Sequence, residues 1–131
     1  MEEENTIYLL RDRISLAIQE AGLLLNLAEF ENDVSLKSYD EALMEYEEFA
    51  PDLIEVERDI RRIDLLLKVC EIKQQRIFKE KGIKTVKEQE QLTREAMLDV
   101  RTKLEGYKEI RDKLRVKRTI LECIIRRGEG I

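Results

Sequence analysis

The chain has 131 residues, of which 40% are charged, and its formal net charge is −5. It contains one proline, no tryptophan and no histidine. The lack of histidine excludes imidazole-based proton transfer and the usual imidazole metal ligand. A charged, proline-poor composition is typical of long helices rather than of a sheet. We therefore expect one all-α domain over residues 1–131 that is not an enzyme and holds no cofactor or metal.

The first predicted helix covers residues 5–31 and is apolar on two opposed faces. One face carries Ile7, Leu10, Ile14, Ala17, Ala21, Leu24 and Ala28. The other lies about 200° around the helix and carries Leu9, Leu16, Leu23 and Phe30. Either this helix lies in a groove of its own chain with some apolar side chains exposed, or its second face packs on another subunit. We favour the homo-oligomer, with the second set as its interface.

The amino terminus, Met1-Glu2-Glu3-Glu4, is acidic where a signal peptide would be basic, and no apolar run approaches the length of a membrane span. We therefore expect a cytoplasmic protein with no membrane contact. After a linker at residues 32–37, Ser38 and Glu41 form a capping box that opens a helix. Pro51 either kinks this helix or separates it from the next one.

The rest of the chain predicts a long antiparallel, coiled-coil-like helical hairpin. Its first arm covers residues 38–81 and ends at Lys79-Glu80-Lys81-Gly82, where the glycine can turn left-handed. Its second arm covers residues 86–127 and begins after a capping box, Thr85 to Glu88. Facing residues should then have numbers that add up to roughly 167, because both arms rise equally per residue. That rule pairs Ile63 with Leu104 and Ile60 with Tyr107.

The same register sets the two cysteines, Cys70 and Cys123, far apart along the hairpin, which excludes an intrachain disulfide. We expect both to be small buried apolar residues.

Charge is segregated along the sequence. Residues 1–57 hold three basic residues against sixteen acidic ones, a balance of −13, whereas residues 58–131 hold twenty-one basic against thirteen acidic, a balance of +8. Cations on a rigid helical rod can neutralise phosphates, and Phe78 and Tyr39 could stack bases. The alternative is an ordinary charged helix surface. The candidate nucleic-acid-binding residues are Lys73, Arg76, Lys79, Lys81, Lys84, Lys87, Arg111, Arg115 and Arg118.

Carboxylates cluster around Pro51, which invites comparison with the helical, magnesium-dependent nucleotide pyrophosphatases. Pro51 interrupts the cluster, and Glu55 and Asp59 are expected on the solvent side of the hairpin seam. A solvated acidic face is therefore the favoured interpretation over a metal site. The cluster consists of Glu45, Glu47, Glu48, Asp52, Glu55, Glu57 and Asp59.

Residues 46–127 carry a charged helix ending at Lys79-Glu80-Lys81-Gly82, then Lys84-Thr85-Val86-Lys87-Glu88, then Arg94-Glu95-Ala96 and a basic arm ending Ile124-Ile125-Arg126-Arg127. This order of elements resembles the UvsY-type recombination mediators of phages. The resemblance implies an oligomeric helical protein that binds single-stranded DNA and helps a recombinase displace single-strand-binding protein. The acidic residues 1–57 depart from what that family would lead us to expect.

The two-faced first helix also fits a second role, that of a structural or chaperone-like adaptor that holds another protein's helix. A phage-encoded inhibitor of a host defence protein is a third possibility that no particular residue favours.

Overall fold

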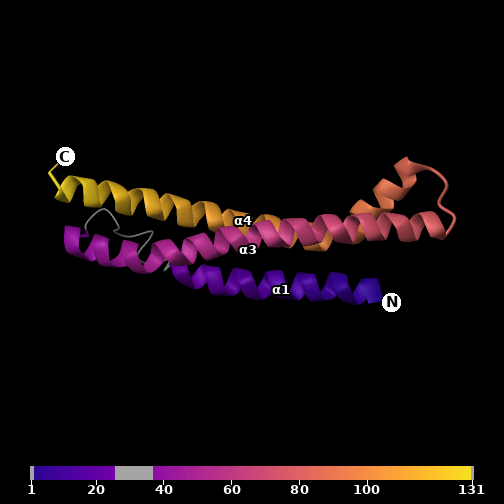
Figure 1. The fold of residues 1–131 in the computed structure, drawn as a ribbon, viewed down its shortest axis with the longest axis horizontal. Helices are drawn as coiled ribbons and strands as arrows, with labels where there is room; N and C mark the ends of the chain where they lie inside the picture. Colours follow the sequence, from indigo (N-terminus) through magenta and orange to yellow (C-terminus); the bar gives the residue numbers. More distant parts are fainter. Residues whose placement is uncertain (1, 26–36, 131) are drawn as a thin grey trace.

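The computed structural model describes residues 2–25 and 37–130, and these form three helices: α1 (Glu2–Leu25), α3 (Tyr39–Glu80) and α4 (Val86–Gly128). Figure 1 shows α3 and α4 running antiparallel, with α1 beside them. α1 packs on both helices and more extensively on α4. The predicted all-α fold, a long helical hairpin with an amino-terminal helix packed against it, is confirmed.

The amino-terminal helix is described over a shorter range than was expected, and the helix that contains Pro51 is unbroken. α1 is described as far as Leu25, so the predicted helical residues 26–31, with Phe30, lie outside the described residues. α3 continues through Pro51, so the interpretation of two separate helices is wrong. A proline in a helix removes one hydrogen bond and crowds the carbonyl four residues earlier. The buried side chains of Phe49 and Leu53 flank it and anchor the helix on both sides, and Figure 1 shows the amino-terminal part of α3 inclined to the remainder.

The two arms meet in the expected register. The Tyr107 hydroxyl donates to Asp59 Oδ2 at 3.0 Å, and the Tyr46 hydroxyl donates to Glu122 Oε1 at 3.3 Å. The residue numbers of the first pair total 166 and those of the second pair total 168, on either side of the expected 167. All predicted facing residues from the middle of the arms are fully or nearly fully buried: Leu53, Ile60, Ile63, Leu67, Val100, Leu104, Tyr107 and Leu114.

α1 supplies the third wall of the core through Leu10, Ile14, Ala21 and Leu25, which are all buried. Burying a leucine or isoleucine side chain contributes about 1.5–3 kcal/mol, so this helix adds substantially to the thin core of a two-helix hairpin. Polar bonds fix its position. Arg13 pairs with Asp59 of α3 at 2.7 Å, and Arg11 pairs with Asp99 of α4 at 3.4 Å.

The cysteines differ from the sequence interpretation. Both are free thiols, but Cys70 is only half-buried and Cys123 is exposed. The expectation that Cys123 is buried was wrong because Cys123 lies about 200° around α4 from the buried Leu121, on the side away from the seam.

Candidate nucleic-acid interface at the hairpin tip

The turn between the arms is a defined structure. The Ile83 amide donates to the Phe78 carbonyl and the Gly82 amide donates to the Lys79 carbonyl, both at 3.1 Å. This pair of bonds is the Schellman motif, in which the residue after the helix cap takes a left-handed conformation. Gly82 has φ 94°, which only glycine adopts without strain. The Thr85 hydroxyl then accepts from the Glu88 amide at 3.2 Å and opens α4.

A polar layer closes the hairpin below this turn. Gln89 is buried, and its side-chain amide donates to the Ile83 carbonyl at 2.7 Å. Thr93, also buried, donates to the Gln89 carbonyl at 2.7 Å. A satisfied buried amide fixes one geometry because any other would leave its polar atoms unpaired. The tip is thus held by directed hydrogen bonds where the arms are held by apolar layers.

Six predicted cations surround this turn, and all six side chains are exposed. None of them forms an ion pair or hydrogen bond with the described side chains of residues 6–25 and 37–130. Three lie on the last turns of α3, two lie between the helices and one lies on the first turn of α4. They are Lys73, Arg76, Lys79, Lys81, Lys84 and Lys87. The sequence places only Glu80 among them, so the tip presents an uncompensated positive surface.

The three predicted cations of the second arm have a different environment. Arg115 pairs with Glu57 at 3.4 Å and Arg118 with the same carboxylate at 3.7 Å. Arg111 pairs with its neighbour Asp112 at 3.1 Å. The structure therefore separates the nine candidates into a free set at the tip and a paired set on the arm.

The two aromatic candidates are also separated. Phe78 lies on the last turn of α3, next to the tip, and is half-buried. Tyr39 lies at the opposite end of the hairpin, where its ring contacts Gly128 of α4 so closely that a Cβ on the glycine would be 2.3 Å from it. Of the two, only Phe78 can contribute to a surface at the tip.

Sequence reasoning missed three further cations on α3. Arg61, Arg62 and Lys68 are exposed and form no ion pair with any described residue. Arg61 and Lys68 lie on the outer side of α3, and Arg62 lies at the rim of the groove between α1 and α3. Their signal in the sequence is the seven-residue step from Arg61 to Lys68, which keeps two cations on one helix face.

The acidic cluster near Pro51 is not the uniformly solvated face that was expected. Glu57 is half-buried between Arg115 and Arg118, and Asp59 is half-buried between Arg13 and Tyr107. The placement of Asp59 on the solvent side was wrong because Arg13 of α1 faces it, a contact that no short sequence pattern indicates. Glu57 thus serves as the partner of two arm cations, and Asp59 joins α3 to α1 and to Tyr107.

Glu45 is the most constrained carboxylate of that cluster. It pairs with Lys117 at 2.9 Å and Lys37 at 2.8 Å. Lys117 is 4% exposed, lies 5.0 Å from the Phe49 ring centroid and donates to the Leu24 carbonyl at 3.0 Å. Burial raises the pKa of the Glu45 carboxyl, but the bonds from the two lysines outweigh it, so its pKa is lowered. Lys117 thereby fastens the end of α1 to the hairpin.

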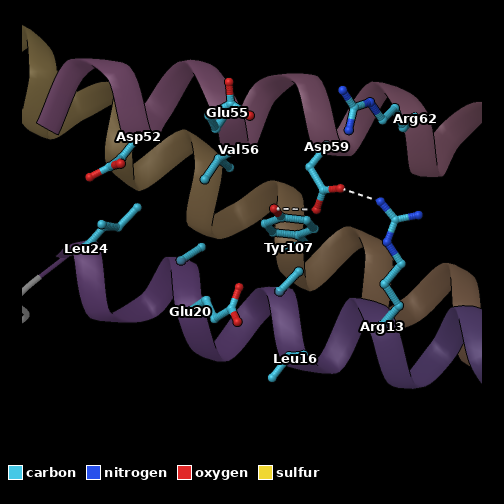
Figure 2. Close-up of a pocket in the computed structure, with 12 residues that line it drawn as sticks. Arg13, Leu16, Glu20, Leu24, Asp52, Glu55, Val56, Asp59, Arg62 and Tyr107 are labelled. Carbon is cyan, nitrogen blue, oxygen red and sulfur yellow. Dashed lines mark hydrogen bonds and ion pairs between the residues drawn. The ribbon is translucent and has the colours of Figure 1, made fainter.

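A groove of about 500 Å³ opens between α1 and α3, with Tyr107 of α4 at its floor. Figure 2 shows Tyr107, Asp59 and Arg13 joined in one chain of bonds across it. Burial, and then the bond to Asp59, raise the pKa of the Tyr107 hydroxyl. Glu20 and Asp52 also line the groove.

The predicted oligomer face of α1 lies on the outside of the described chain. Leu9, Leu16 and Leu23 are 69%, 56% and 81% exposed. Exposed apolar side chains that follow one another along a helix often mark a surface that binds a partner.

No helix within the described ranges is both long and apolar enough to cross a membrane. Comparisons with protein-family models, with curated proteins and with solved structures gave no match.

Proposed function

We propose that this protein is an oligomeric, cytoplasmic accessory factor that binds single-stranded DNA through the tip of its helical hairpin and assists the loading of a recombinase. The observation that carries the proposal is the set of six exposed cations around Gly82, none paired with a described carboxylate. A recombinase and single-strand-binding protein are the protein partners that the UvsY-type resemblance implies.

The electrostatics favour the tip over the arm. A phosphate that binds a free lysine releases a counterion and gains affinity, whereas a phosphate that binds Arg115 must compete with Glu57 for it. Half-buried Phe78 offers an aromatic edge beside the cations, and stacking on an aromatic side chain contributes about 1–3 kcal/mol per base. We therefore assign DNA contact to residues 73–87 and a structural role to Arg111, Arg115 and Arg118.

A salt titration of binding to a labelled single-stranded oligonucleotide tests the proposal. If all six tip cations contact phosphates, the logarithm of the binding constant falls with the logarithm of salt concentration with a slope of up to about −4. Absence of binding even at low salt would remove the nucleic-acid role and leave the adaptor described below.

Charge reversal at the tip makes the test residue-specific. We expect Lys79→Glu, Lys81→Glu and Lys84→Glu together to weaken binding and to reduce the slope by about 2. The matched control is Lys113→Glu, Arg126→Glu and Arg127→Glu, which changes the net charge equally at exposed positions away from the tip. Equal loss of affinity in the two triple variants would mean that net charge, rather than the tip, binds the DNA.

A second candidate is a structural or chaperone-like adaptor that binds another protein. The exposed leucines of α1 favour it, because such a stripe is buried when a partner helix packs on it. This role requires no affinity for DNA, so the low-salt titration distinguishes the two candidates.

A further inference from the structure

A second apolar stripe runs along the outer side of α3. Leu65, Val69 and Ile72 follow one another at spacings of four and three, and they are 64%, 48% and 60% exposed. That spacing keeps side chains on one face of a helix and is the repeat of a coiled-coil seam. The seam between the two arms runs along a different face of this segment, through the buried Ile63 and Leu67.

This stripe faces neither neighbouring helix of its own chain. Asp64, one residue before Leu65, points to α4 and pairs with Lys108 at 3.3 Å. Asp59 points to α1 and pairs with Arg13. Each residue advances about 100° around a helix, so Leu65 lies roughly 120° from Asp59 and turns away from both partners. The face is thus a helix surface without a partner in the described chain.

The outer stripe of α1 shares a seven-residue step with the α3 stripe. Leu9, Leu16 and Leu23 recur every seven residues and span roughly 20 Å along the helix. On α3, Leu65 and Ile72 are seven residues apart, and Ile54, which is 49% exposed, lies on the same face eleven residues before Leu65. Two helices with a seven-residue apolar repeat can pack against each other with their side chains interlocked.

The charges beside the two stripes are opposite. The α3 stripe is flanked by Arg61, Arg62 and Lys68, which are exposed and form no ion pair with any residue in the described ranges. On α1, Arg11 pairs with Asp99 and Asp12, and Arg13 pairs with Asp59. The outer side of α1 therefore carries the exposed carboxylate of Asp12 and no described cation that lacks a carboxylate partner.

We propose that the outer face of α1 in one copy of this chain docks on the Leu65–Ile72 face of α3 in the next copy. Opposite charges beside the stripes favour this pairing, whereas pairing of α1 with α1 would bring carboxylates together. Because the two faces are different surfaces of one molecule, the contact either repeats head-to-tail into rings or filaments or is made twice in a twofold dimer. The inference does not depend on DNA binding.

Two complementary variants of the full chain test the contact. Leu16→Glu with Leu23→Glu destroys only the α1 face, and Leu65→Glu with Ile72→Glu destroys only the α3 face. All four side chains are exposed, so each variant should keep the helical circular dichroism of the wild type. We expect the wild type to assemble, each variant to be monomeric in light scattering, and an equimolar mixture to form a dimer, since one intact junction remains.

The control variant, Leu98→Glu with Val116→Glu, changes two exposed apolar residues of α4 and should assemble like the wild type. A monomeric wild type would overturn the proposal and leave the stripes to another protein. Full assembly of the Leu65→Glu, Ile72→Glu variant would also overturn it, because α1 faces would then be pairing with each other. A mixture that stays monomeric would do the same.

Discussion

The tip and the arms of the hairpin use the same residue type for different purposes. On the arms, cations lie against carboxylates of a neighbouring helix: Arg101 with Glu71, Lys108 with Asp64, and Arg115 with Glu57. At the tip, six cations surround a glycine turn and none has a described ion-pair partner. A count of lysines and arginines cannot separate the two regions, whereas their partners can.

The difference follows from what each region is near. Along the arms, α3 supplies acidic side chains opposite α4, so the positive balance of residues 58–131 is neutralised locally. Exposed pairs of this kind contribute only about 0–1 kcal/mol each, but they also leave those cations unavailable to a phosphate. At the tip the chain reverses within a few residues, and α1 approaches only its base, where Thr6 and Ile7 lie beside Lys73.

The largest expected effect concerns the one cation that the arms bury. Replacing Lys117 with Met should lower the free energy of unfolding by about 2 kcal/mol, since Glu45 keeps Lys37 but it and the Leu24 carbonyl each lose a charge-assisted hydrogen bond. Lys113→Met, at an exposed position of the same helix, should change it by less than about 0.5 kcal/mol. Urea denaturation measures both. Equal values would show that burial does not distinguish arm cations from free ones.

A smaller effect is expected at the turn that shapes the tip. Gly82→Ala should destabilise the fold by about 1 kcal/mol, because a residue with a Cβ is strained at φ 94°. Gly22→Ala is the matched control in the helical interior of α1, where an added Cβ meets no atom within 4 Å, and should stabilise by about 0.5–1 kcal/mol. Thermal unfolding distinguishes them, and stabilisation by both changes would contradict the left-handed turn.

Stability should fall at both ends of the pH range through groups of the packed region. The pKa of Glu45 is lowered from 4.5, so its contribution is fully present above pH 4.5 and is lost as the pH falls through the folded value. The pKa of Tyr107 is raised from 10.0, so its contribution is present below pH 10.0 and is lost as the pH rises. Urea midpoints across pH measure both, and Glu45→Gln and Tyr107→Phe should each flatten one side. If either variant keeps the wild-type dependence of the urea midpoint on pH, the replaced group does not contribute to that dependence.

The fold could be predicted from the sequence to a large extent because it depends on local signals and one repeat. Gly82, the Thr85 cap and the apolar spacing from Leu53 to Leu67 each concern residues close together in the chain. The placement of α1 could not be predicted in the same way. Its contacts, such as Arg13 with Asp59 and Lys117 with the Leu24 carbonyl, join residues that no short pattern relates.

The candidate site could likewise be predicted only where it depends on residues close together in the sequence. Exposure of the tip lysines follows from their position beside a turn, which the sequence locates. Pairing of Arg115 and Arg118 with Glu57 depends on how the arms rotate about their axes, which the register alone does not specify. The same rotation leaves Leu65, Val69 and Ile72 outside the seam, and it is also why Asp59 was misplaced.

Lysine footprinting tests the assignment of DNA contact to the tip most directly. Lysines of the wild-type protein are acetylated with and without a single-stranded oligonucleotide, and protection is quantified by mass spectrometry. We expect Lys79, Lys81, Lys84 and Lys87 to be protected, with Lys103, Lys108 and Lys113 of the arm unchanged. Protection of the arm lysines with the tip left reactive would contradict the division between the two regions.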